Sequence, residues 1–378
     1  MNLEDTKKAA AAAVPDYVLA IAPYQAGKPI GELAREFKLD PAGIVKLASN
    51  ENPLGLPESA RRAMADAISG LGRYPDPNGF ELKAALSARY GVPADWITLG
   101  NGSNDLLELA SLALLAPGAS AVYAQHAFTV YRLATQARGA RHIMVPARDY
   151  GHDLDAMYDA IDEDTRLVFI ANPNNPTGTF LSADRIAAFL ARVHDRWGDR
   201  VTVLLDEAYN EYLDPEFRFD SARWVEQYGN LIVSRTFSKA YGLAGLRVGY
   251  AIAQPGLTDV LNRVRQPFNV NSLAQVAAIA ALGDAAFLQQ SYELNKMGKQ
   301  VLVEGFTRLG LEFVPSYGNF VLVRVGDAAR INLELLKQGV IVRPVAGDGL
   351  PEWLRVSIGL PDENARFLDA LTATLRAP

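Results

Sequence analysis

Residues 231–252 read LIVSRTFSKAYGLAGLRVGYAI, two apolar runs with a polar stretch between them that contains one lysine, Lys239. The runs Leu231–Ser234 and Val248–Ile252 are short and rich in Val, Ile and Leu, which is typical of buried strands. Hydroxyl residues flank the lysine, and Arg247 follows it by eight positions. The stretch therefore predicts two strands of a sheet with a group of basic and hydroxyl side chains between them.

Similar apolar runs recur through the middle of the chain, from about Asn52 to Gly283, and helix-length amphipathic segments separate most of them. A mostly parallel sheet with helices on both faces has this pattern, because its strands are buried on both sides. We predict seven strands, at Trp96–Leu99, Ser120–Tyr123, Arg141–Val145, Leu167–Ile170, Val201–Leu205, Leu231–Ser234 and Val248–Ile252.

The C-terminal part of the chain has a different pattern, which indicates a second unit. A long helical segment runs from about Ala286 to Leu309, and strand-like runs follow at Phe320–Val325 and Arg355–Ile358. The 378 residues also exceed the roughly 250–300 residues at which single cores stop growing. We predict an α/β protein with a large domain at residues 52–285, a small α+β domain at residues 286–378, and an N-terminal arm at residues 1–51 that forms part of the small domain.

Charge and composition exclude several classes of protein. Asp and Glu number 43 against 37 Lys and Arg, a net charge of −6, so the basic field that attracts nucleic acids or anionic membranes is missing. The chain has no cysteine, which excludes disulfides and a cysteine nucleophile, and its four histidines lack the spacing of a metal site. The first residues lack the apolar core of a signal peptide, and no apolar run approaches the ~18 residues that cross a bilayer. We therefore expect a cytoplasmic protein without a metal site and without a nucleic-acid or membrane partner.

The position of Lys239 just after a strand suits a lysine that forms a Schiff base with a carbonyl cofactor. To act as a nucleophile near neutral pH, its pKa must fall from ~10.4 by about 3 units, or ~4 kcal/mol, a direction that burial and nearby positive charge favour. Thr236, Ser238 and Arg247 then suit a phosphate on the same cofactor, with Arg247 as its forked, charged partner. The alternative is a surface lysine in an unrelated loop.

Two other strand ends carry polar groups that suit such a cofactor. Asp206 ends a buried run three residues before Tyr209, and a carboxylate there can hold a pyridine nitrogen protonated. Asn175 lies in IANPNNPTG, residues 170–178, and offers an amide to a phenolate oxygen. Both segments have plainer alternatives, because Asp often caps a helix after a strand and because Asn, Pro and Gly favour turns.

A glycine-rich turn, LGNGSNDL at residues 99–106, follows a predicted strand and begins a helix. Backbone amides at such a helix start can bind a phosphate. The turn does not complete the Gly-x-Gly-x-x-Gly pattern, so it matches neither the dinucleotide fingerprint nor the Walker motif. Glycine turns of this kind occur in many α/β folds, so the turn supports a phosphate site only together with the other segments.

Together these segments resemble the fold-type I aminotransferases, which use pyridoxal 5′-phosphate (PLP), and within them the histidinol-phosphate aminotransferase family. The resemblance to PLP enzymes rests on residues 171–178 and 206–209, on Ser238-Lys239 and on Arg247. The resemblance to the subfamily rests on residues 22–24 (APY), 47–53 (LASNENP), 73–76 (RYPD) and 102–105 (GSND). It covers nearly the whole chain, from Pro23 to Arg355. It implies that the large domain binds PLP and contains a seven-stranded, mostly parallel sheet sandwiched by helices.

The resemblance implies a role for each polar residue of these segments. Lys239 would form the Schiff base with PLP and later move a proton between substrate and cofactor, while Asp206 would pair with the pyridine nitrogen. Asn175 and Tyr209 would bind the phenolic oxygen of the ring. The residues around the phosphate would be Ser103, Asn104, Thr236, Ser238 and Arg247.

Two aromatic positions also follow from the resemblance. Tyr74 would bind the phosphate of the neighbouring subunit's cofactor, which implies a homodimer with shared active sites. The aromatic residue that stacks on the ring usually follows Pro-Thr, but here residues 125–131 read QHAFTVY, so His126 replaces the proline. This departure leaves open whether His126 or Phe128 faces the ring, and we expect Phe128.

Two arginines beside strand-like residues, Arg343 and Arg355, indicate where substrate binds. An inward-pointing guanidinium is costly unless an anion meets it. By resemblance, Arg355 would bind the α-carboxylate of glutamate or the phosphate of histidinol phosphate, Arg343 would assist, and Tyr24 and Asn50 would complete the pocket. The alternative is that both arginines form interdomain salt bridges.

The reaction implied is PLP-dependent transamination between L-histidinol phosphate and 2-oxoglutarate, giving imidazole acetol phosphate and L-glutamate, a step of histidine biosynthesis. Three alternatives are an aromatic amino-acid aminotransferase of the same family, a PLP-dependent decarboxylase of a phosphorylated amino acid, and a non-enzymatic PLP-binding regulator. Such regulators usually carry an added DNA-binding domain, and the match begins near Pro23, which leaves little room for one.

Overall fold

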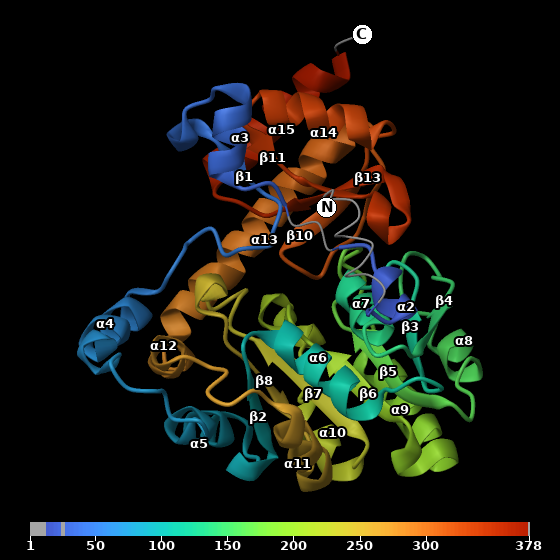
Figure 1. Cartoon of the computed structure of the whole chain (residues 1–378). Coiled ribbons are helices and arrows are strands. Elements are labelled where there is room, and N and C mark those ends of the chain that lie inside the picture. The colour runs from blue at the N-terminus through green and yellow to red at the C-terminus, as the bar shows by residue number, and fades with distance from the viewer. Residues whose placement is uncertain (1–12, 24–26, 377–378) are drawn as a thin grey trace, which may run out of the picture.

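The computed structural model describes residues 13–23 and 27–376, and its elements form two groups around separate sheets (Figure 1). The larger sheet has seven strands in the order β2-β8-β7-β6-β5-β3-β4. These strands are β2 (Ile97–Gly100), β3 (Ser120–Ala124), β4 (Arg141–Val145), β5 (Thr165–Ala171), β6 (Thr202–Asp206), β7 (Leu231–Thr236) and β8 (Gly249–Ile252). Strand β8 runs antiparallel to both of its neighbours, and the other paired strands are parallel. All seven predicted strands are confirmed, with slightly different ends.

Helices cover both faces of this sheet, as predicted. They are α4 (Glu58–Ala67), α5 (Phe80–Tyr90), α6 (Ser103–Leu114), α7 (Thr129–Gln136), α8 (Leu154–Asp159), α9 (Ala183–Trp197), α10 (Ala222–Gln227), α11 (Pro255–Val264) and α12 (Ser272–Leu282). In β5, Val168 and Ile170 pack in one buried cluster with α5, α8, α9 and α12, whereas Leu167 and Phe169 pack in another with α6, α7 and α11. Adjacent residues of a strand point to opposite faces, so a strand covered on both sides is apolar throughout.

The second group of elements contains two small sheets, seen at the top of Figure 1. Strands β12 (Arg343–Val345), β13 (Leu350–Ser357), β10 (Phe320–Arg324) and β9 (Phe313–Val314) form an antiparallel sheet in that order. Near the N-terminus, β1 (Val45–Lys46) pairs with β11 (Val340–Ile341) in parallel. The remaining helices of this group are α3 (Ile30–Phe37), α13 (Ala285–Arg308), α14 (Ala328–Lys337) and α15 (Pro361–Arg376), whereas α2 (Asp16–Leu19) lies beside α7 of the larger group (Figure 1).

A core of its own supports this second group. It joins Val45 and Leu47 of the N-terminal segment with apolar side chains of β10, β13, α13, α14 and α15. Val45 and Leu47 thus pack with the C-terminal elements, and α13 matches the predicted long helix. Strand β13 begins earlier than predicted, at Leu350. The domain boundaries at residues 51 and 285 stay a prediction.

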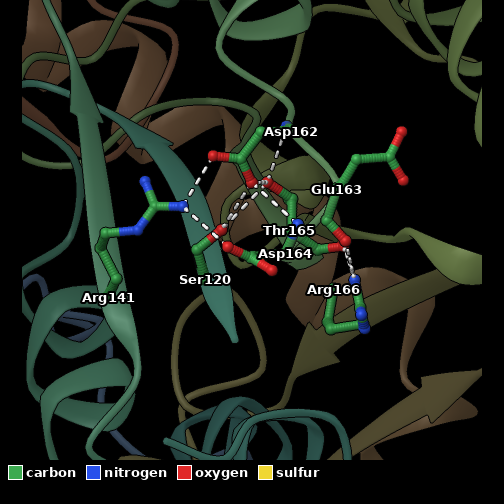
Figure 2. Close-up of polar contacts among 7 residues, drawn as sticks. All are labelled: Ser120, Arg141, Asp162, Glu163, Asp164, Thr165 and Arg166. Atoms are coloured by element: carbon green, nitrogen blue, oxygen red, sulfur yellow. Dashed lines mark hydrogen bonds and ion pairs between the residues drawn. The ribbon is translucent and has the colours of Figure 1, made fainter. Parts of the chain in front are cut away.

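A polar cluster closes the amino-terminal ends of β3 and β5 (Figure 2). The hydroxyls of Ser120 and Thr165 lie 3.0 Å apart, and Thr165 Oγ1 also donates to Asp162 Oδ1 and accepts from the Asp162 backbone N–H, each at 3.0 Å. Arg141 Nη2 donates to Asp162 Oδ2 at 2.6 Å. These bonds satisfy the polar groups of this edge within the chain, whereas the polar groups at the opposite, carboxyl ends of β5, β6 and β7 line a cavity.

Among the residues that the structure describes, no single helix is long and apolar enough to cross a membrane. Helices α12 and α13 together pass a test of length and composition, but an 80° bend separates them.

Candidate active site

The predicted site residues converge on a cavity of about 210 Å³ at the carboxyl ends of the central strands. In the register of the sheet, Ala171 of β5 faces Asp206 of β6, and Asp206 faces Ser234 of β7, so the three loops that follow start side by side. Ligands of open α/β sheets bind at this edge. The predicted residues that line the cavity are Asn50, Ser103, Asn104, Phe128, Asn175, Asp206, Tyr209, Thr236, Ser238, Lys239, Arg247, Arg343 and Arg355.

Two predicted site residues are not in this set. Tyr24 lies outside the described residues. Tyr74 is 82% exposed and stacks on Phe268, with 4.6 Å between the ring centroids. This chain alone therefore does not bring Tyr74 to the cavity, and its implied role across a dimer stays a prediction.

Lys239 lies in the turn after β7, where its amine is largely removed from water. Its Nζ donates to the backbone carbonyl of Ser49 at 3.0 Å and lies 5.9 Å from the centroid of the Tyr209 ring. Burial lowers the pKa of Lys239 to about 7, the positive charges of Arg355 and Arg247 act in the same direction, and nearby carboxylates oppose them. A large fraction of the amine is therefore neutral at physiological pH, as a nucleophile requires.

Asp206 is a buried carboxylate at the end of β6. Its Oδ2 accepts a hydrogen bond of 2.9 Å from the hydroxyl of Tyr131, whereas Oδ1 is buried and has no hydrogen-bond partner among the described residues. Burial raises the pKa of Asp206 to about 6, against the effect of the Tyr131 hydrogen bond. The alternative of a helix cap is wrong, because the next helical turn, Asn210–Tyr212, begins only after Tyr209. A buried oxygen without a donor suits a ligand N–H.

The start of α6 and Arg247 form a cradle for an anion. Gly102, which precedes the helix, has a φ of +86°, and a Cβ there would lie only 2.2 Å from Arg247 Nη2. Arg247 Nη1 donates to Ser238 Oγ at 3.1 Å, and the Ser238 N–H donates to Thr236 Oγ1 at 3.1 Å. The glycine thus lets a guanidinium approach a helix N-terminus, a combination that suits a phosphate.

Asn175 and Tyr209 face the cavity from two neighbouring loops. Asn175 Oδ1 accepts from Arg355 Nη1 at 2.6 Å, which turns the amide's N–H groups toward other partners. Tyr209 Oη accepts from Asn50 Nδ2 at 3.0 Å. Asn175 is therefore more than a turn residue, because its side chain belongs to the cavity wall.

Phe128 and His126 have different surroundings, and only Phe128 is among the residues that line the cavity. Phe128 lines the cavity and packs edge-on against Tyr131, with 5.9 Å between ring centroids. His126 instead bonds through Nδ1 to the backbone carbonyl of Asp348, at 2.6 Å, and has a φ of +57°. The geometry therefore supports Phe128 as the residue at a ring, and the stacking role itself stays a prediction.

Arg343 and Arg355 lie directly opposite each other on β12 and β13. Like charges in such a cross-strand pair repel, so an anion between them is favourable. Arg355 is 8% exposed and donates to two neutral oxygens, Asn175 Oδ1 and, at 2.6 Å, the carbonyl of Ala48. Through these bonds it links the two groups of elements.

Sequence reasoning missed three partners of the reactive groups, namely Tyr131, Ala48 and Ser49. Tyr131 lies one helical turn after Phe128, and this spacing was the available signal that both could share the cavity. The carbonyls of Ala48 and Ser49, which accept from Arg355 and Lys239, carry no side-chain signal at all.

Comparisons with known proteins agree with this geometry. Residues 42–371 match the family model described as aminotransferase class I and II. Histidinol-phosphate aminotransferase 1 of Cupriavidus pinatubonensis is 70% identical over 366 residues, 96% of each chain, and histidinol-phosphate aminotransferase 2 of Ralstonia nicotianae is 68% identical over 96% of each. The crystal structure of the Sinorhizobium meliloti histidinol-phosphate aminotransferase in complex with pyridoxal 5′-phosphate superimposes with a TM-score of 0.87, at 28% identity over 96% of this chain and 98% of that one.

The lowered pKa of Lys239 predicts how covalent loading of PLP depends on pH. Only the neutral amine attacks an aldehyde, so below about pH 7 the loading rate of the apoprotein should fall roughly tenfold per pH unit, and above it should level off. The measurement is stopped-flow absorbance, with Nα-acetyl-lysine in solution supplying the cofactor's own pH dependence and Lys239→Ala the background. A rate that keeps rising tenfold per unit to pH 10 would contradict the prediction.

The hydrogen bond from Tyr131 predicts a loss of cofactor affinity in Tyr131→Phe. Without this donor the pKa of Asp206 rises further, so a smaller fraction of the carboxyl is ionised and able to pair with a protonated ring nitrogen. We expect the PLP dissociation constant to increase roughly tenfold, the loss typical of one hydrogen bond to a charged group. Tyr123→Phe is the matched control, since the Tyr123 hydroxyl bonds to His142 and does not line the cavity. Equal effects of the two substitutions on affinity would show that the Asp206 contact is unimportant.

Proposed function

The chain belongs to the class I and II aminotransferases, and we propose that it transfers the amino group of L-histidinol phosphate to 2-oxoglutarate, giving imidazole acetol phosphate and L-glutamate. The observation that carries this proposal is the 70% identity to a histidinol-phosphate aminotransferase over 96% of both chains. This reaction is a step of histidine biosynthesis. The arrangement of charged groups in the cavity supports the same chemistry.

The residues present fit PLP, the cofactor of this family. Its phosphate suits the cradle of Gly102, Ser238 and Arg247, and its ring nitrogen suits the unpartnered oxygen of Asp206. When bound, PLP supplies an electron sink that makes the carbon bearing the substrate's amine acidic.

Lys239 and Asp206 divide the proton chemistry between them. A neutral Lys239 amine would hold the cofactor through its aldehyde carbon. Once the substrate's amine displaces it there, the Lys239 amine would take the proton from the amine-bearing carbon and deliver it to the former aldehyde carbon. An ionised Asp206 favours the protonated form of the ring nitrogen. Its Oδ1, which has no hydrogen-bond partner among the described residues, can accept the N–H of that nitrogen. Burial of both groups keeps water from competing for these protons.

Substrate anions bind at Arg355 and Arg343 in this proposal. The two arginines are paired across neighbouring strands and both line the cavity, so one anion can lie within reach of both positive charges. Such a pair accepts a carboxylate of glutamate or the phosphate of histidinol phosphate, which lets the two half-reactions use the same pocket in turn. Arg355 also donates to Asn175 Oδ1 and to the carbonyl of Ala48, and these bonds fix its position beside the cavity.

A substrate panel tests the proposed reaction. With 2-oxoglutarate as acceptor, we expect kcat/KM for L-histidinol phosphate to exceed that for L-phenylalanine, and Arg355→Gln to raise KM for histidinol phosphate roughly tenfold or more, the loss of one charged contact. A higher kcat/KM with phenylalanine would indicate an aromatic aminotransferase. Release of CO2 from a phosphorylated amino acid, without a keto acid, would indicate a decarboxylase.

We also propose that the protein is a cytoplasmic homodimer with shared active sites. Supporting this, Tyr74 stacks on Phe268, which is 39% exposed, and large apolar side chains close to Tyr74 in the sequence are exposed as well, namely Ile68 (58%), Leu71 (47%) and Phe80 (70%). Exposed apolar groups of this size mark surfaces that bind a partner. A second copy of the chain would cover them and bring its Tyr74 to the cofactor phosphate.

Mixed dimers test the shared site. Lys239→Ala lacks the reactive amine, and Tyr74→Phe should lose roughly tenfold in activity through one missing hydrogen bond. Because a heterodimer of the two pairs an intact Lys239 with an intact Tyr74 in one of its sites, subunit exchange should restore activity above that of either variant. Heterodimers, verified by native mass spectrometry, that recover no activity would count against a role of Tyr74 across the interface.

A further inference from the structure

We propose that Ser357 is a positioning residue that orients the side chain of Asn50 and, through it, the hydroxyl of Tyr209 toward the cofactor. The proposal rests on the cofactor part of the proposed function. It also reassigns Asn50, which the family resemblance places against substrate.

Each polar group of Asn50, in the backbone and in the side chain, forms a hydrogen bond within the protein. It is 1% exposed and has a φ of +54°, a conformation that Asn tolerates better than most residues. Its backbone N–H donates to Ser357 Oγ at 2.9 Å, and its carbonyl accepts from Asn319 Nδ2 at 3.0 Å. Its side-chain Oδ1 accepts from Ser357 Oγ at 2.8 Å, and its Nδ2 donates to Tyr209 Oη at 3.0 Å. Because all these groups already form hydrogen bonds within the protein, we assign Asn50 to the positioning of Tyr209 rather than to substrate binding.

Ser357 decides which way the Asn50 amide points. The hydroxyl of Ser357 accepts the backbone N–H of Asn50, so its single proton is left to be donated. It donates that proton to the Asn50 side chain, and only the amide oxygen can receive it. The amide nitrogen must then point the other way, toward Tyr209.

The direction of the Asn50 amide fixes what Tyr209 can do. A tyrosine hydroxyl has one proton to donate, and Asn50 Nδ2 already occupies one of its acceptor positions. The Tyr209 proton is therefore donated away from Asn50, and in the loaded protein it meets the phenolic oxygen of the ring. A hydroxyl that accepts a hydrogen bond is also a stronger donor, because bonds in a chain polarise one another.

The same strand supports both this chain of bonds and the substrate anion. Ser357 follows Arg355 by two residues on β13, so both side chains lie on one face of the strand. Arg355 donates to the carbonyl of Ala48, two residues before Asn50. The position of β13 therefore sets the geometry of the substrate arginine and of the Tyr209 hydroxyl together.

The experiment measures the pH midpoint of the absorbance change of bound PLP in Ser357→Ala, Asn50→Gly and the double variant. A weaker bond from Tyr209 leaves more negative charge on the phenolic oxygen, which holds the neighbouring Schiff-base proton more tightly. We expect Ser357→Ala to raise the midpoint by roughly 0.3 to 1 pH unit, the range set by one neutral hydrogen bond. Asn50→Gly, which suits the positive φ, should raise it as well, and the double variant should add nothing to Asn50→Gly.

Two controls separate orientation from general destabilisation. Ser357→Thr keeps the hydroxyl and should keep the wild-type midpoint. Ser291 is also 3% exposed, and its Oγ accepts from Asn52 Nδ2 at 2.8 Å, so Ser291→Ala removes a comparable buried hydroxyl away from Tyr209. It should lower Tm without moving the midpoint.

Three outcomes would overturn the proposal: an unchanged midpoint in Ser357→Ala, an equal shift in Ser291→Ala, or no rescue by Ser357→Thr. A wild-type protein that shows no PLP absorbance band would instead contradict the proposed function, so the two failures are distinguishable.

Discussion

The chemistry of the site depends on the burial of the Lys239 amine, because burial lowers its pKa. Burial at the carboxyl edge of the sheet, together with the charges of Arg355 and Arg247, brings its pKa to about 7. A lysine in water would be almost fully protonated at that pH and unable to attack a carbonyl. The sheet edge and the two arginines together create this environment, although they belong to distant parts of the chain.

The same burial acts in the opposite direction on Asp206, whose pKa rises to about 6. Burial thus favours the neutral form of both Lys239 and Asp206, and the hydrogen bond from Tyr131 favours the ionised form of Asp206. A ligand with a protonated nitrogen at one end and a phosphate at the other matches these charges. This complementarity explains how a chain with a net charge of −6 contains a site for anions.

The fold and the principal reactive residues were predictable because their signals are local. A strand covered on both faces is apolar throughout, so the seven runs are visible without knowing their partners. Lys239, Asp206 and Asn175 lie at or just after such runs, and ligands of parallel sheets bind at that edge. The contacts of Tyr131 with Asp206 and of Ser357 with Asn50 were not predictable, since they join residues 75 and 307 positions apart. The His126 departure was visible in the sequence, but only its bond to Asp348 explains where the imidazole goes.

The sequence by itself determined the succession of strands and helices along the chain, the chemical type of each reactive group and the family to which the chain is related. Local hydrophobic pattern and residue chemistry are sufficient for these, because neither depends on distant neighbours. Only the tertiary structure decided the protonation of those groups and the direction of their hydrogen bonds. A pKa depends on burial and nearby charge, and the direction of a hydrogen bond depends on the atoms opposite, which folding brings together from both ends of the chain.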